Sequence, residues 1–297
     1  MTTRRRILLT ALAAPLALAK SPARYEIAIE GYIFQQYAEK KKKPLAEIIP
    51  EVLPMARAAG FANIELNPAF FTLAVRSRTL ALLTSLGLRM PSIYVGGPMH
   101  TVDDASRTIA SAIEYARMAA PFGCKGVVNN PDPKPGGAPK TDAELAAEAE
   151  GLNRMGRALA AEGCELRVHH HTPQLENNAR EWRHILAHTD PNLVHICVDV
   201  DWAYEGGFEA VPFLREAGSR VREIHVRSAK NKVWLEAVED SDIDYRQVAA
   251  YFEQQRLHPL IVVELAYRKE TIVTRPLEED LRLSRIYTQK VFGIPGS

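Results

Sequence analysis

The chain has 297 residues, with 37 basic and 36 acidic side chains and a hydrophobic fraction of 46%. This composition is that of a globular protein, and the formal charge of +1 gives no electrostatic reason to expect nucleic acid or a membrane surface as a partner. The three cysteines form no CxxC pair and lie beside or within apolar runs, so they predict small buried side chains rather than disulfides or metal ligands.

Residues 1–19 predict an export signal that is removed. Three arginines, Arg4 to Arg6, precede an apolar run that ends in the small-residue cleavage pattern Ala17-Leu18-Ala19. The run is shorter than the roughly 20 residues that span a bilayer. An arginine pair followed by Ile7 is typical of a twin-arginine signal, with an ordinary secretory signal or an uncleaved anchor as alternatives. Cleavage removes three arginines and no acids, so the charge of +1 becomes −2. We therefore expect a periplasmic or secreted protein with no stable membrane association.

Residues 20–297 predict one α/β domain in which short apolar strands alternate with amphipathic helices, without a Ser/Gly linker. The predicted strands cover 25–33, 62–66, 88–95, 126–129, 165–171, 194–200, 221–227 and 260–265. The predicted helices cover 45–59, 79–86, 103–119, 141–161, 178–188, 208–217, 245–255 and 277–291. Thr141 with Glu144 predicts a capping box.

The alternation of strands and helices requires a parallel sheet, and eight strand–helix units predict a (β/α)8 TIM barrel. A doubly wound open sheet is the alternative, but no G-x-G-x-x-G follows the first strand.

Three consecutive histidines end the fifth predicted strand. Side chains alternate faces along a strand, so His169 and His171 point to one side and His170 to the other. Neutral imidazole is the commonest protein metal ligand. A metal site and a histidine cluster without metal remain equal alternatives on this triplet alone.

The other strand ends carry further donors. Glu65 ends the second strand, Asp199 and Asp201 the sixth, His225 the seventh and Glu264 the eighth. In a TIM barrel these ends meet at the catalytic face. Buried carboxylates are costly unless they are paired or coordinated, so nitrogen and oxygen donors on successive strands favour a shared divalent cation over a buried hydrogen-bond network.

With these donors in place, the chain resembles the xylose-isomerase-like barrels, the sugar phosphate isomerase/epimerase family. The resemblance is sharpest from the fifth strand onward and rests on segments that begin at Val168, Cys197, Ile224, Asp242 and Val262: VHHH, CVDVDWA, IHVR, DIDY and VVE. It implies that His169, Asp199, His225 and Glu264 bind one divalent metal, with Mn, Zn, Co, Fe and Mg left open. Trp202, Ser228, the segment 239–241 and His169 depart from the family pattern, and two of these departures bear most directly on function. Trp202 stands where many relatives have a substrate-binding histidine, and His169 replaces one of the two carboxylate bases of epimerases.

The remaining roles are hypotheses with simple structural alternatives. Glu264 could act as the base while it binds metal through one oxygen. His171 and Glu65 could also be catalytic. Alternatively, His171 could support a metal ligand and Glu65 could form a structural ion pair.

Substrate contacts are expected from aromatic and polar side chains at the same strand ends. Trp202 could stack on a sugar, as could Tyr94, which could equally be core. Arg227 could bind a hydroxyl or anionic group, or pair with a neighbouring acid. Asn129 could bind substrate or form a turn. Lys40 to Lys43 predict a solvated loop.

These residues predict a metal-dependent sugar isomerase or epimerase that works through an enediolate next to a carbonyl. A lyase or dehydratase acting on an oxidised sugar is the near alternative, because the same intermediate serves both reactions. A non-catalytic periplasmic sugar-binding protein is a third reading. An endonuclease would need more metal ligands and a basic face. We expect a small carbohydrate as the substrate, and a homo-oligomer is left open.

Overall fold

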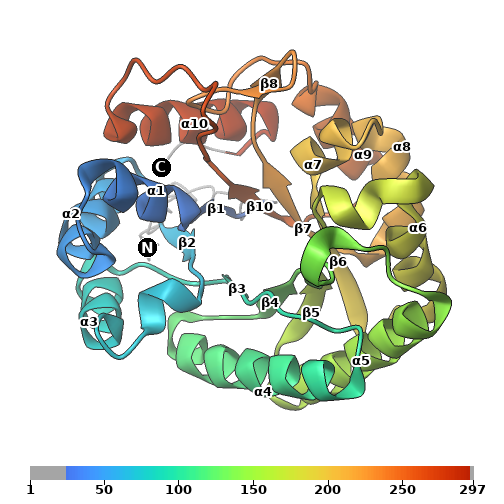
Figure 1. Ribbon diagram of the computed structural model, residues 1–297. Coiled ribbons are helices and arrows are strands. Elements are labelled where there is room, and N and C mark those ends of the chain that lie inside the picture. Colours follow the sequence, from blue (N-terminus) through green and yellow to red (C-terminus); the bar gives the residue numbers. More distant parts are fainter. Residues whose placement is uncertain (1–24, 295–297) are drawn as a thin grey trace, which may run out of the picture.

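The computed structural model describes residues 25–294, and within this range eight parallel strands form the centre of the molecule. Figure 1 shows them surrounded by a ring of helices. The strands are β1 Ile27–Glu30, β2 Asn63–Glu65, β3 Ser92–Tyr94, β4 Gly126–Asn129, β5 Glu165–Val168, β6 Val194–Asp199, β7 Val221–Val226 and β10 Leu260–Val263.

The strand order closes the sheet into a barrel. Hydrogen bonding runs β2-β1-β10-β7-β6-β5-β4-β3, and parallel bridges between Asn63 and Arg89 and between Leu66 and Ile93 join β2 to β3. The predicted (β/α)8 TIM barrel is therefore confirmed. The carboxyl ends of all eight strands lie at one face, as this topology requires.

Ten α-helices cover the outside of the barrel in the described residues. They are α1 Tyr32–Lys41, α2 Leu45–Ala58, α3 Arg76–Leu86, α4 Val102–Ala119, α5 Asp142–Ala161, α6 Thr172–His188, α7 Val200–Glu205, α8 Ala210–Ala217, α9 Tyr245–Gln255 and α10 Leu277–Val291. Short 3-10 turns occupy Pro68–Phe71, Ala120–Phe122, Pro135–Gly137 and Gly218–Arg220. Apolar faces of the helices pack against the strands in one core, which explains why the strands read as continuous apolar runs.

The first strand is shorter than its sequence predicts. β1 ends at Glu30, and α1 begins at Tyr32, because Ile33 and Phe34 are buried on a helix and do not extend the strand. Gly31 allows this abrupt turn, since a Cβ here would lie 2.8 Å from Leu66 and 3.1 Å from Phe70. The predicted lysine loop is shorter for the same reason: Lys42 and Lys43 lie between α1 and α2, whereas Lys40 and Lys41 belong to α1. All four lysines are exposed, as predicted.

Lys40 and Lys41 form the last turn of α1, and Lys42 is its left-handed C-cap. Basic side chains are favourable at this end of a helix.

Three further features of the fold differ from the sequence prediction. α6 begins six residues earlier than expected, and its interruption at Glu176 to Ala179 explains why the helical pattern is visible only from Asn178. α7 follows Asp199 directly, with the Asp199 side chain accepting a hydrogen bond from the Trp202 N–H. A small hairpin, β8 Ala229–Lys230 and β9 Val233–Trp234, follows β7.

The predicted leader, residues 1–19, lies outside the described residues. Within residues 25–294, no helix combines the length and apolarity that a membrane crossing would need.

The Thr141 capping box is present: the Thr141 hydroxyl accepts from the Glu144 N–H, and the Glu144 carboxylate accepts from the Thr141 N–H. Replacing Thr141 with Ala should lower the free energy of unfolding by about 1 kcal/mol, because an orphan N–H of α5 loses its partner. Urea unfolding followed by circular dichroism measures this, with Thr141→Ser as the control that keeps the cap. Equal stability of Thr141→Ala and the wild type would contradict the assignment.

Candidate metal centre and active site

A cavity of about 530 Å³ opens at the carboxyl ends of the strands. Its wall is formed by loops after β1, β2, β5, β6, β7 and β10 together with the end of β3. The lining residues are Glu30, Tyr32, Gln36, Asn67, Tyr94, His171, Trp202, His225, Arg227, Trp234, Glu264, Ala266, Tyr267 and Arg268.

Four predicted donors meet beside this cavity. His169 follows β5, Asp199 ends β6, His225 lies within β7 and Glu264 follows β10. One ligand atom from each lies within 4.8 Å of all the others. The structure thus brings together residues up to 95 positions apart in the sequence.

The donor set fits a divalent cation. Both ring nitrogens of His169 are buried without a hydrogen-bond partner, which is costly for an imidazole unless it binds another group. The Nε2 atom of His169 lies 3.6 Å from a carboxylate oxygen of Asp199. Two imidazoles and two carboxylates suit Zn, Mn, Fe or Co. The four residues could therefore hold the predicted metal ion, whose binding and identity stay predictions.

Burial and neighbouring charges together set the protonation of these donors in the metal-free protein. It lowers the pKa of His169 well below its ordinary value and raises the pKa of Asp199 to about 8, although Arg227 opposes the second shift. Burial also disfavours ionised Glu264, but Arg227 and His225 outweigh it and hold the pKa of this carboxyl below its usual range. Burial lowers the pKa of His171 to about 4. At neutral pH, His169 and His171 are thus neutral and Glu264 is ionised.

A second layer of charges lies deeper in the barrel, below His225. A carboxylate oxygen of Glu65 lies 3.1 Å from His225 Nε2, while Nδ1 of the same ring lies 2.7 Å from Glu264. Glu223 is held by Arg167 at 2.8 Å and accepts a hydrogen bond from the Ser92 hydroxyl. His225 therefore has a carboxylate on each side, one facing the cavity and one in the barrel floor.

Glu65 is fully buried and does not line the cavity. Its predicted catalytic role stays a prediction. Its position favours support of His225.

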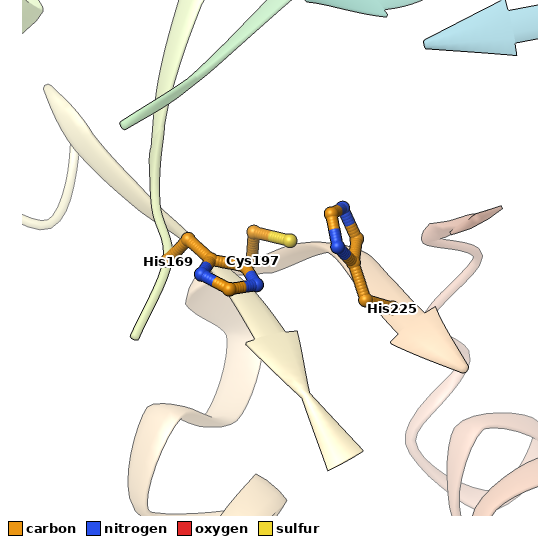
Figure 2. Close-up of side chains that lie close together, drawn as sticks. All are labelled: His169, Cys197 and His225. Atoms are coloured by element: carbon orange, nitrogen blue, oxygen red, sulfur yellow. The ribbon is translucent and has the colours of Figure 1, made fainter. Parts of the chain in front are cut away.

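The buried thiol of Cys197 lies beside His169 and His225. Figure 2 shows the side chains of His169, Cys197 and His225 pointing toward one another, and one ligand atom from each lies within 4.8 Å of the other two. Cys197 is two residues before Asp199 on β6, so its side chain points into the barrel one step deeper. All three cysteines are free and buried, as predicted, but the contact of Cys197 with the histidine pair was not expected from the sequence.

The predicted substrate residues divide into two groups. Trp202 and Arg227 line the cavity, and so does Tyr94. Arg227 pairs with Asp199 at 3.2 Å and with Glu264 at 2.5 Å.

Asn129 is instead fully buried and donates a hydrogen bond to the Val95 carbonyl, away from the cavity wall. Substrate binding by Asn129 stays a prediction.

Several residues that line the cavity were not predicted from the sequence. Glu30 was hidden inside an over-long predicted strand, although a carboxylate at a strand end was the signal that revealed the others. Trp234 lies on the unpredicted hairpin, where its indole N–H donates to Asp201. Arg227 and Arg268 have their guanidinium carbons 4.0 and 3.8 Å from the centre of the Trp234 ring. Cation–π contacts of this kind order the aromatic wall of the cavity.

Residues 53–287 match the sequence model of a family described as Xylose isomerase-like TIM barrel. The chain belongs to this family.

This xylose isomerase-like barrel is similar to curated inosose dehydratases. It is 27% identical to the inosose dehydratase of Geobacillus kaustophilus over 181 residues, which are 56% of this chain and 58% of that protein. It is 27% identical to that of Salmonella typhimurium over 142 residues, 42% of this chain and 47% of the relative. The matched segments thus span about half the length of these relatives.

Solved structures of the same fold resemble the barrel over most of its length. A sugar phosphate isomerase/epimerase from Parabacteroides distasonis superposes with a TM-score of 0.71 at 17% identity, covering 92% of this chain and 96% of that one. A D-psicose 3-epimerase from Clostridium cellulolyticum gives 0.68 at 13% identity, covering 90% and 99%. At such identities the likeness shows the fold alone.

Metal affinity should rise with pH. The pKa of Asp199, raised to about 8 by burial, means that this carboxyl holds a proton at pH 7, which a bound ion must displace. Against the effect of burial, neighbouring groups such as Glu65 raise the pKa of His225 well above its ordinary value, so this ring must release a proton as well. We therefore expect Mn²⁺ affinity to increase by at least about tenfold per pH unit from pH 6 to 8. Calorimetric titration in two buffers of different ionisation enthalpy measures the proton released. Affinity that is constant over this range, without proton release, would refute the expectation.

Replacing Glu65 with Gln should weaken Mn²⁺ binding by about 10- to 100-fold, because His225 loses the carboxylate that orients its ring and raises its basicity as a ligand. The matched control is Glu165→Gln, which makes the same chemical change at a carboxylate that pairs with Arg167 and leaves the contact of Glu65 with His225. Dissociation constants that agree between Glu65→Gln and the wild type would exclude this support role.

Proposed function

We propose that the chain is a divalent-metal-dependent lyase that eliminates water from a keto-sugar or keto-cyclitol. The observation that carries the proposal is a single ionised carboxylate, Glu264, that both belongs to the donor cluster and lines the cavity. At the position where epimerases would have the second carboxylate base, the chain has His169, a buried member of the donor cluster. An elimination needs only one base. The similarity to inosose dehydratases, over about half their length, supports the same reaction class.

The residues of the cavity have distinct tasks in this scheme. Glu264, kept ionised by Arg227, accepts the proton from the carbon next to the carbonyl. A divalent ion bound by His169, Asp199, His225 and Glu264 would supply a Lewis acid for the carbonyl oxygen. Trp202 and Trp234 offer ring faces for the C–H groups of a sugar. Tyr267 and Arg268 complete the wall.

A second candidate is the isomerisation or epimerisation expected from the sequence. His171 favours it, because it lines the cavity as a neutral imidazole and could move a proton on another face of the substrate. The two reactions share the first proton transfer. They differ in the second step, which is loss of a hydroxyl group in one and return of a proton in the other.

We also propose export through the twin-arginine route, which would place the enzyme in the periplasm or outside the cell. Its support is the sequence of residues 1–19 alone.

The test is turnover of a panel of neutral ketoses and 2-keto-myo-inositol in D₂O by Mn²⁺-loaded protein, followed by NMR and ultraviolet absorbance. We expect deuterium at the α-carbon and an unsaturated or diketo product. Glu264→Gln should lower both by about 10²- to 10⁴-fold. An isomer or epimer as the only product would favour the second candidate. Binding without exchange or turnover would indicate a sugar-binding protein.

A further inference from the structure

A second carboxyl group, that of Glu30, faces the same cavity. Glu30 is the last residue of β1, lines the cavity and is 4% exposed. Ile29 pairs with Val263 in the neighbouring strand, which places Glu30 beside Glu264 across the β1–β10 pair. On its other side, Glu30 pairs in register with Glu65. Carboxyl groups thus stand side by side on three adjacent strands.

The surroundings of Glu30 differ from those of Glu264. In residues 25–294, Glu30 accepts one hydrogen bond, from the Tyr32 N–H at 2.5 Å, and forms no ion pair with a lysine or arginine. Glu264 has Arg227 at 2.5 Å. One carboxyl group is therefore neutralised by a cation, whereas the other relies on a backbone N–H.

This difference separates the protonation states of the two groups. Burial, followed by the negative charges of Glu264 and Glu65, raises the pKa of Glu30 well above its ordinary value, whereas the Glu264 carboxylate is paired with the Arg227 guanidinium. A neutral acid and an ionised base in one cavity are the pair that acid–base catalysis uses.

We propose that Glu30 is the general acid that protonates the leaving hydroxyl group during the elimination. The inference rests on the proposed lyase function. Glu264 takes the α-proton, the C–H electron pair forms the new Cα=Cβ bond, and the Cβ–O bond breaks toward the oxygen. That oxygen takes the proton of Glu30 and leaves as water. Glu30 is then a carboxylate and Glu264 a carboxylic acid, and exchange with solvent restores both, without any oxidant or reductant.

The role predicts that the two halves of the reaction separate in Glu30→Gln. Gln keeps an acceptor for the Tyr32 N–H but has no acidic proton. With the substrate that the wild type turns over, α-deuterium exchange in D₂O should stay within about threefold of the wild type. Loss of water should fall by about 10²- to 10⁴-fold. A substrate analogue with fluorine in place of the leaving hydroxyl should react at near wild-type rate, because fluoride leaves without a proton.

Control variants distinguish this role from a structural one. Glu26→Gln makes the same chemical change just before β1, where the side chain is half exposed and lies 3.6 Å from Arg89, and should behave as the wild type. Glu30→Asp keeps an acidic proton and should recover part of the elimination. If Glu30→Gln does not fold, a fall in water loss without a fall in fluoride loss in Glu30→Asp is the expected result, and an equal fall in both assigns a structural role. Mn²⁺ stoichiometry and circular dichroism should match the wild type in each folded variant.

Three outcomes would overturn the proposal. Water loss at the wild-type rate in Glu30→Gln would remove Glu30 alone from the mechanism. Equal loss of exchange, water elimination and fluoride elimination would assign it a structural role. A wild type that exchanges the α-proton without eliminating water would refute the lyase function itself.

Discussion

Ionisable side chains that are buried at the carboxyl ends of the parallel strands must find partners inside the barrel, because burial removes them from bulk water. Asp199 and Glu65 are fully buried and His169 and His225 nearly so. The chain meets this constraint by placing imidazoles between carboxylates and by setting Arg227 against Asp199 and Glu264. The same arrangement leaves His169 with unpartnered ring nitrogens. A cation shared by the four donors would give His169 a partner. The same cation would serve the proposed reaction.

Residues that support the metal donors lie deeper in the barrel than the residues that face the substrate cavity. Arg167, Glu223 and Ser92 bind one another in the floor, and Glu65 joins them to His225. Residues of the rim, by contrast, face the cavity: Glu264 at one strand end and Glu30 at the next. Loss of one partner from a buried charge network costs more than loss of a surface pair. The floor can therefore hold the donors in place while the rim exchanges protons with a substrate.

Much of this architecture could be predicted from the sequence. Alternation of strands and helices gave the barrel, and polar residues that end apolar runs gave His169, Asp199, His225 and Glu264. Glu30 was missed by this criterion only because Ile33 and Phe34, which are buried on a helix, extended the apolar pattern past the true end of the strand. Arg167 and Glu223 pair across 56 positions of the sequence, so their pairing depends on topology and register rather than on local pattern. Asn129 shows the converse: a polar strand end whose side chain binds the backbone of the neighbouring strand and does not reach the cavity.

The central claim is that four distant side chains share one cation. Anomalous diffraction at the zinc edge, from crystals grown with one equivalent of Zn²⁺, tests it most directly. We expect a single strong peak within about 2.3 Å of a nitrogen of His169, a nitrogen of His225 and carboxylate oxygens of Asp199 and Glu264. A zinc peak bound elsewhere, with Arg227 still between Asp199 and Glu264, would contradict the account.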